Sequence, residues 1–202
     1  MMEGFFIIQK GKAMYSLKRV LEIALSGKHN CIFFGSVDLM PITIEKFFIA
    51  CCLPCKCGRF FRGACTCSDL DIQYTLANIP SRQLNLSDMY VPINDLRQDV
   101  DCERINAVHR MQERRYRNNK SKYNGNLSRN GFEKYCRMDF EAQEFLKDAQ
   151  KFFKCSMTDM DKVVRVARTI ADLEFRETIS RFDVAEALGY VSCYLHLKRR
   201  IV

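Results

Sequence analysis

The sequence predicts a small α/β part followed by an all-α helical bundle, which makes the chain mainly α overall. Residues 1–100 combine an amphipathic helix with short apolar runs, and all 4 prolines of the chain lie there. From Asp101 onward the sequence is charged, rich in helix-forming residues and free of proline. This change in composition predicts a domain boundary between residues 1–100 and residues 101–202.

The first part is predicted to contain one helix and two or three strands. In residues 12–25, KAMYSLKRVLEIAL, apolar side chains recur every three or four positions, and Gly27 ends this helix. The apolar runs CIFF, at 31–34, and KFFIACC, at 46–52, are typical of short buried strands. MYVPI, at 89–93, indicates one more strand. The sequence that separates the last two runs has no long period.

The second part is predicted to contain four or five helices. The first covers about 103–118, and a polar loop rich in asparagine follows it. Residues that favour helix N-caps mark the starts of the others: Ser128 for a short helix through Cys136, Asp139 for 140–153, Thr158 with Asp161 for the helix ending at Leu173, and Ser180 with Asp183 for the last helix. A helical bundle follows from this pattern.

The composition argues against a membrane-spanning or secreted protein. No apolar run reaches the ~20 residues needed to span a bilayer, and the N-terminal MMEGFFIIQKGK has too short an apolar block for a secretory signal. We therefore expect a cytoplasmic protein without a membrane partner. In that reducing compartment the 11 cysteines are expected to be thiols or metal thiolates, and those that stand singly are expected to be small buried apolar side chains.

Four cysteines are closely spaced inside the segment 51–68. Cys55 and Cys57 form one C-x-C pair, and Cys65 and Cys67 form a second pair after seven intervening residues. Two thiolate pairs joined by a hairpin can supply the tetrahedral sulfur ligands of a structural zinc ion, so we predict zinc bound by these four residues. Because all four positions are filled by protein, catalytic zinc is not expected.

The two preceding cysteines leave alternatives open. Cys51 and Cys52 either compete as ligands or are strand residues, one of them facing the core, and we favour the second interpretation. Cys52 and Cys55 have the C-x-x-C spacing of redox motifs, but the sequence lacks the βαβ context of a thioredoxin-like fold.

A basic segment lies at the start of the second part. Residues 103–122 contain seven Lys or Arg against two Glu. This charge predicts contact with a phosphate backbone of DNA or RNA. An ordinary solvated helix face explains it equally well. The candidate nucleic-acid residues are Arg110, Arg114, Arg115, Arg117, Lys120 and Lys122.

Several separated stretches resemble the magnesium-chelatase-like AAA+ ATPases of the ComM/YifB type. VVRVARTIADL, at 163–173, and ISRFDVAEALGY, at 179–190, resemble the C-terminal helical domain of that family, and NGNLS, at 124–128, matches it too. The cysteine-bearing PCKCG and CTC resemble its cysteine segment, and residues 17–35 resemble the helix and strand that lead into its phosphate-binding loop. The resemblance implies a remnant of an AAA+ core followed by the helical lid.

The sequence departs from that family where ATP chemistry is expected. The family loop ends in Gly-Lys-Thr, whereas GSVDLMPI, at 35–42, keeps only Gly35 and has Pro41 and Ile42 in place of the lysine and the hydroxyl residue. The segment with paired acidic residues is missing. Leu53, Leu86 and the Ser156 region replace the sensor and arginine-finger residues of the family.

One family arginine is present, and it has two interpretations. Arg168 matches a family position and is either a residual phosphate contact or the partner of Asp172 in an i, i+4 salt bridge, and we favour the salt bridge. With ATP not expected as a cofactor, we expect a degenerate protein that has lost ATP hydrolysis and is a protein- or DNA-interaction module. The alternatives are an ATP-binding, DNA-remodelling subunit in a mixed ring with an intact AAA+ paralogue, self-association, and a non-functional remnant.

Overall fold

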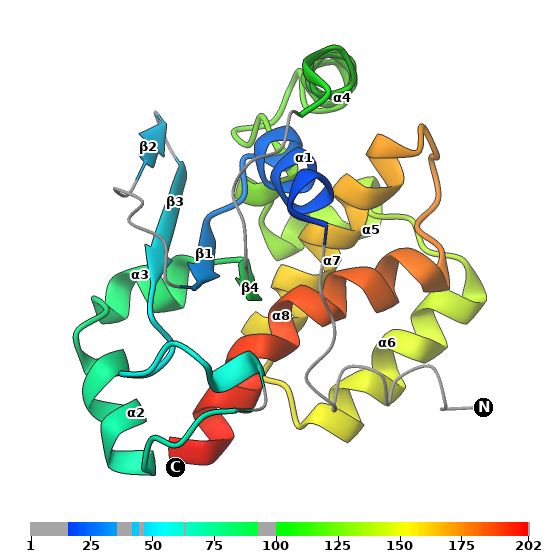
Figure 1. Cartoon of the computed structure of the whole chain (residues 1–202). Coiled ribbons are helices and arrows are strands. Elements are labelled where there is room, and N and C mark those ends of the chain that lie inside the picture. The colour runs from blue at the N-terminus through cyan, green and yellow to red at the C-terminus, as the bar shows by residue number, and fades with distance from the viewer. Residues whose placement is uncertain (1–15, 36–41, 45–46, 63, 93–99, 202) are drawn as a thin grey trace.

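A four-stranded sheet carries helices on both faces and continues into a helical half (Figure 1). The computed structural model describes residues 16–35, 42–44, 47–62, 64–92 and 100–201. This architecture confirms the predicted fold class, a small α/β part followed by helices.

The sheet is short and mainly parallel. Its strands are β1 (Cys31–Phe34), β2 (Ile42–Ile44), β3 (Phe47–Cys52) and β4 (Met89–Pro92), in the order β2-β3-β1-β4. β1 is central and parallel to both β3 and β4, whereas β2 pairs antiparallel with β3 at the edge. The three apolar runs predicted as strands are confirmed.

Strand alternation separates two hydrophobic cores, because successive side chains of a strand point to opposite faces. On β1, Cys31 and Phe33 face one core while Ile32 and Phe34 face the other. The larger, which we call the main core, contains residues of α1 (Leu17–Gly27) and most of the helical half. The smaller, which we call the clip core, contains Ile32, Phe34, Ala50, Cys55, Ile72, Leu76, Ile79, Tyr90, Cys193 and Tyr194.

The first helix ends in a tight approach to the helical half. Lys28 takes the left-handed conformation at φ 51° and closes the C-terminus of α1. A β-carbon at Gly27 would lie 2.2 Å from the His29 ring and 2.5 Å from the Thr169 hydroxyl. Only glycine fits there, so the residue predicted to end the helix also permits this close packing.

Two helices that the sequence pattern did not indicate connect β3 to β4. They are α2 (Asp69–Ala77) and α3 (Ser81–Leu86), and the short 3-10 turn η2 (Phe60–Arg62) precedes them. α2 begins with a capping box in which Ser68 and Asp71 bond each other's backbone N–H. Because α2 buries only Ile72 and Leu76, its apolar signal is too short to stand out from sequence.

The helical half contains the predicted helices. They are α4 (Cys102–Arg115), α5 (Phe132–Tyr135), α6 (Phe140–Phe153), α7 (Met157–Leu173) and α8 (Arg181–Ile201), with the 3-10 turns η3 (Asn124–Asn126) and η4 (Arg129–Gly131) between α4 and α5. Among the described residues, no helix is long and apolar enough to cross a membrane.

Two of the predicted caps are wrong. Ser128 precedes the 3-10 turn η4 without a side-chain cap hydrogen bond, and the N-cap of α5 is Gly131. Asp139 caps α6 as expected, with its carboxylate accepting from the Ala142 N–H at 2.7 Å. Ser180 precedes α8, and its N–H donates to Asp183 at 2.7 Å. For α7, however, Ser156 is the N-cap and forms a capping box with Asp159, whereas Thr158 lies inside the first turn. Both Ser and Thr satisfy the cap rule, and the start lies one half-turn earlier than predicted.

Candidate metal centre and arginine network

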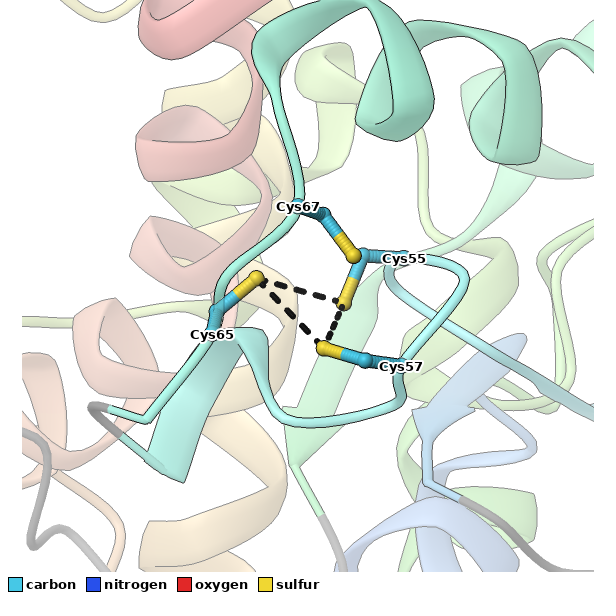
Figure 2. Close-up of side chains that lie close together, drawn as sticks. All are labelled: Cys55, Cys57, Cys65 and Cys67. Carbon is cyan, nitrogen blue, oxygen red and sulfur yellow. Dashed lines mark hydrogen bonds between the residues drawn. The ribbon is translucent and has the colours of Figure 1, made fainter.

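The four cysteines of the two C-x-C pairs converge on one point (Figure 2). The Sγ atoms of Cys55, Cys57, Cys65 and Cys67 all lie within 4.8 Å of one another. Cys55 Sγ is 3.5 Å from Cys57 Sγ and 3.6 Å from Cys65 Sγ, and the Cys57 and Cys65 sulfurs are 3.7 Å apart. Within the described part of the chain, this is the group of His, Cys, Asp or Glu that could hold a metal ion.

Local backbone geometry produces this convergence. β3 ends two residues before Pro54, and Cys55 follows. Gly58, at φ 70°, then reverses the direction of the chain, and its N–H donates to the Cys55 carbonyl at 2.9 Å. A positive φ is easy for glycine and costly for other residues. The second pair then returns beside the first, immediately before α2. Cys55 is fully buried and Cys57 is exposed, so the group lies at the rim of the clip core.

The surroundings of these thiols lower the pKa of one and raise the pKa of others. A hydrogen bond from the Arg59 backbone N–H, the largest influence, lowers the pKa of Cys57 to about 6. Burial raises the pKa of Cys55, and burial also raises the pKa of Cys65. At neutral pH one thiolate is therefore favoured, and a cation among the sulfurs would favour loss of the other protons.

The donor set fits zinc better than it fits a disulfide knot. Four sulfurs at Zn–S distances of ~2.3 Å in a tetrahedron would be about 3.8 Å apart, close to the separations present here. All 11 cysteines are free thiols. The four sulfurs are therefore arranged as a metal site and not as disulfides.

The two preceding cysteines are strand residues. Cys51 packs against the main core and Cys52 against the clip core. Burial raises the pKa of Cys51 to about 11 and that of Cys52 to about 12, which opposes a reactive thiolate. Of the single cysteines, Cys102 differs from expectation because it is exposed at the start of α4.

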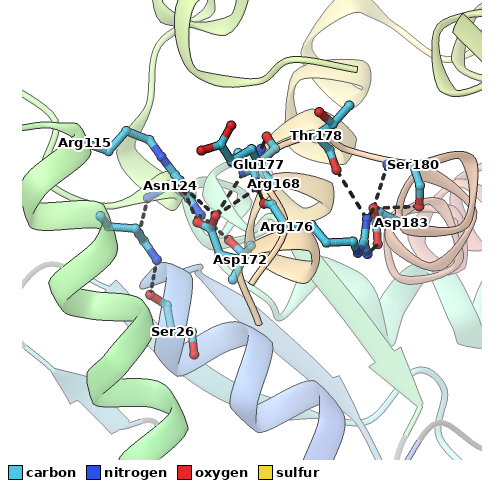
Figure 3. A network of polar contacts seen from close by, with 12 residues as sticks. Ser26, Arg115, Asn124, Arg168, Asp172, Arg176, Glu177, Thr178, Ser180 and Asp183 are labelled. Atoms are coloured by element: carbon cyan, nitrogen blue, oxygen red, sulfur yellow. Dashed lines mark hydrogen bonds and ion pairs between the residues drawn. The ribbon is translucent and has the colours of Figure 1, made fainter. Parts of the chain in front are cut away.

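A second polar cluster surrounds Asp172, which is fully buried (Figure 3). Its two oxygens accept from Arg115 at 2.7 and 2.6 Å, and one of them accepts from Arg168 Nε at 3.1 Å. Arg168 also donates to the backbone carbonyls of Arg176 and Glu177 in the α7–α8 loop. The salt bridge between Arg168 and Asp172 is the arrangement favoured from the sequence.

Asn124 completes this cluster and explains the NGN segment. Its side-chain N–H groups donate to Asp172 and to Thr169, both at 2.9 Å, and its carbonyl oxygen accepts from the Tyr116 hydroxyl at 2.6 Å. A β-carbon at Gly125 would lie 2.6 Å from the Lys28 carbonyl oxygen. The segment therefore presses against the end of α1, where only glycine fits.

His29 lies between the sheet and the helical half in an arrangement like that of a catalytic triad. Its Nε2 is 2.7 Å from the Thr169 hydroxyl, and its Nδ1 is 3.3 Å from Asp88. Arg165 donates to the other oxygen of Asp88 at 2.7 Å. His29 and Thr169 are 0% exposed and Asp88 is 2% exposed, so no substrate can reach the hydroxyl. The three residues connect the two parts of the chain.

The basic residues divide into two groups. Arg110, Arg114 and Arg117 are exposed on α4 and just after it, and Lys120 and Lys122 are exposed in the following loop. Arg115 is instead engaged with Asp172. α4 lies beside α1 at the periphery of the molecule (Figure 1).

Comparison with known proteins finds a family match in the helical half. Residues 99–191 match the family described as magnesium chelatase, subunit ChlI C-terminal. This part of the chain is similar to the C-terminal domain of magnesium chelatase. The chain is 35% identical over 88 residues to the protein named uncharacterized protein YifB from Salmonella typhimurium strain LT2, a match that covers 44% of this chain and 17% of that relative. The ComM/YifB resemblance is confirmed over part of the chain.

Some of the buried polar residues have no signal in the sequence pattern. Gln112 is fully buried and donates to the Ser26 carbonyl at 2.9 Å. No motif or periodicity in the sequence indicates that Gln112 or Asp88 is buried. Gly35, the residue kept from the phosphate-binding loop, donates its N–H to the Cys52 carbonyl at 3.1 Å and so extends the pairing of β1 with β3. Asp38 and Pro41 lie outside the described residues.

Proposed function

We propose that this magnesium-chelatase-like protein does not hydrolyse ATP and acts as an interaction module whose cysteine hairpin is stabilised by zinc. The observation that carries the proposal is the convergence of four sulfurs within 4.8 Å at the end of a central strand. Zinc would be held by Cys55, Cys57, Cys65 and Cys67. It would supply structural cross-linking only, because the chain fills all four ligand positions.

The contacts of Arg168, which matches an arginine of the family, support the loss of ATP hydrolysis. Arg168 is 1% exposed, and its donors are directed to Asp172 and to two backbone carbonyls. An arginine that must stabilise a phosphate needs its fork free to face the ligand. Pro41 and Ile42 stand where the family has the lysine and the hydroxyl residue of the phosphate-binding loop. In our proposal, these substitutions and the occupied Arg168 mean that the chain lacks the groups needed to bind and hydrolyse ATP.

Two measurements on the purified full chain test this proposal. Native mass spectrometry before and after chelation is expected to show one zinc ion per chain, and Cys57→Ser is expected to lose it while Cys102→Ser, also an exposed cysteine, retains it. Phosphate release with magnesium and ATP is expected to stay at background across the gel-filtration peak. Turnover that follows the protein through that peak would overturn the non-enzymatic proposal, and so would a requirement for an intact paralogue in a mixed assembly.

A second candidate function is binding of the nucleic-acid backbone by α4 and the loop after it. Arg110 and Arg114 are four residues apart on α4, so they share one exposed face of the helix, and Arg117 lies in the turn just after it. With the two loop lysines, these arginines outnumber the exposed Glu113 beside them, and such an excess of positive charge is what phosphate binding requires. We leave Arg115 out of this group because it is paired with Asp172.

Titration of single- and double-stranded DNA over a range of salt concentrations tests the second candidate. Each phosphate contact is expected to change the logarithmic salt slope by about 0.9 for a duplex. Arg114→Gln should reduce the slope by about 1, while Arg82→Gln, which removes an exposed charge from α3, should leave it unchanged. Absence of binding at low salt would exclude this function.

A further inference from the structure

The clip core joins the cysteine hairpin to the end of the last helix. Cys55 shares this core with Cys193 and Tyr194 of α8 and with Ile72 and Leu76 of α2. α2 also contacts α8 directly. Figure 1 shows the hairpin and α2 beside the C-terminal half of α8, and Figure 2 shows the cysteines in front of that helix.

The hairpin contributes aromatic side chains as well as sulfur. Phe60 and Phe61 of η2 pack against the clip core, with ring centroids 4.9 Å apart. Phe61 in turn lies 5.5 Å from Phe34 of the central strand β1. These two rings therefore cover the face of the sheet that is turned away from the main core.

Two residues near the end of α8, Cys193 and Tyr194, belong to the same core. Tyr194 stacks on Tyr90 of β4 with centroids 4.5 Å apart. The Tyr90 hydroxyl donates to the Ser87 carbonyl at 3.1 Å and accepts from Lys162 of α7 at 3.0 Å. Cys193 is buried beside Tyr194. This contact attaches the last described turns of the helical half to the sheet.

Apart from the burial of Cys55 and the packing of Phe60 and Phe61 against the clip core, the described part of the hairpin has little regular structure to hold it in place. Its described residues between Cys52 and Ser68 belong to no strand, and the backbone hydrogen bond from Gly58 to Cys55 spans only its first turn. Lys56, Arg59 and Cys57 are exposed. Without a cross-link between the two cysteine pairs, such a segment loses its conformation readily because loop ordering is costly in entropy.

We infer that the metal site is a staple that fixes the hairpin and α2 to the sheet and to α8, so that metal loss releases α2 while the main core stays folded. The inference rests on the metal site proposed above. It follows from the two separate cores: the hairpin and α2 contribute to the clip core alone, whereas α1, α6, residues 163–173 of α7 and three residues near the end of α8 (Tyr190, Val191 and Leu195) contribute to the main core. Zinc availability would then control how firmly α2 is attached.

Hydrogen exchange read by mass spectrometry on the full chain tests the staple. Zinc-loaded chain, chelator-treated chain and the Cys57→Ser variant are compared under reducing conditions, with Cys102→Ser as the matched control. Residues 69–77 are expected to exchange at least about tenfold faster after metal loss, because local opening free energies fall when a clamp is removed. Residues 163–173 are expected to keep their protection.

The outcomes separate the staple from the metal site. A chain that binds one zinc ion but shows equal exchange in residues 69–77 with and without metal refutes the staple and leaves the metal site standing. Equal acceleration of residues 163–173 refutes it as well, because the metal would then stabilise the whole fold. A chain that never binds zinc refutes both. Chelation of the wild-type chain keeps the test valid if Cys57→Ser does not fold.

Discussion

At the residue scale, Asp172 is the carboxylate on which two buried arginine contacts depend. Replacing it with alanine leaves Arg115 and Arg168 without their shared anion and leaves Asn124 short of an acceptor. Removing one partner of a buried ion pair typically costs about 3–5 kcal/mol, since the remaining charge stays desolvated. We expect Asp172→Ala to lower the free energy of unfolding by about that amount, measured by urea titration.

A surface ion pair gives the control for this prediction. Asp161 accepts from Arg129 at 2.6 Å, but water screens that pair because the Arg129 side chain is 45% exposed. Asp161→Ala should therefore change the urea midpoint far less than Asp172→Ala. Equal effects of the two substitutions would show that burial does not set the importance of the Asp172 cluster.

Asp88 makes stability depend on pH. Burial by itself would raise its pKa, but the charge of Arg165 and the hydrogen bond with His29 outweigh burial and hold the pKa of Asp88 below its ordinary value. A carboxyl with a lowered pKa stabilises the fold at pH values above its unfolded pKa of about 4, and this contribution is lost as the pH falls through the folded pKa.

The variant Asp88→Asn is expected to remove part of this acid dependence. Urea unfolding measured from pH 7 down to about pH 3 should lose stability steeply in the wild-type chain and less steeply in the variant. Since the carboxamide keeps the shape of the carboxylate, the difference in slope reports the charge. Parallel curves for the two proteins would contradict the role assigned to Asp88.

At the scale of single elements, the N-cap of α7 gives a direct comparison of two neighbouring positions. The Ser156 hydroxyl accepts from the Asp159 N–H at 3.2 Å, and the Asp159 carboxylate accepts from the Ser156 N–H at the same distance. Ser156→Ala should lower the free energy of unfolding by about 1 kcal/mol. Thr158→Ala should be nearly neutral, because Thr158 is exposed inside the first turn. Thermal melts of both variants measure the effect.

The elements could largely be predicted from the sequence, and the reasons for the exceptions are physical. Long helices such as α6 and α7 have a sustained apolar period, and the strands are short apolar runs, so local pattern suffices for both. α2 and α3 bury few side chains and lack that period. The sequence pattern predicts the N-cap of α7 two residues too late. Ser156 and Thr158 have equivalent hydroxyls, and each has an Asp three residues further on.

The candidate site was only partly predictable for a different reason. The four cysteines are close in sequence, so their spacing alone indicated a cluster. The partners of His29 are Asp88 and Thr169, which lie 59 and 140 residues away, and no periodicity connects them. Arg168 and Asp172 were paired correctly because i, i+4 neighbours meet on a helix.

At the scale of the whole molecule, the main core runs across the predicted boundary at residue 100. Val20, Ile23 and Phe33 from the first part share it with Val163 and Ala167 of α7. Polar contacts cross this boundary as well, since Arg19 pairs with Glu174 and Glu186, and Gln112 donates to the Ser26 carbonyl. The boundary between 1–100 and 101–202 is therefore a proposal about composition and descent, and a truncation decides whether it is also a folding boundary.

We expect residues 100–202 alone to lose cooperative unfolding. Without α1 and the sheet, the faces of α7 and α8 that carry Val163, Ala167 and Leu188 are exposed to water, and each buried apolar side chain so exposed costs roughly 1.5–3 kcal/mol. For Val163 and Leu188 alone the sum is roughly 3–6 kcal/mol, a large part of the 5–15 kcal/mol by which domains are usually stable. Calorimetry of the fragment should therefore show no sharp transition, whereas the full chain should show one.

Adding the missing part back distinguishes loss of packing from damage to the fragment. Residues 1–99 co-expressed as a separate chain should restore a cooperative transition, because His29 and Asp88 would again meet Thr169 and Arg165. A His29→Ala version of the added piece serves as the matched control and should restore less. If residues 100–202 alone melt as sharply as the full chain, the helical half carries its own fold, and the main core is then two cores in contact.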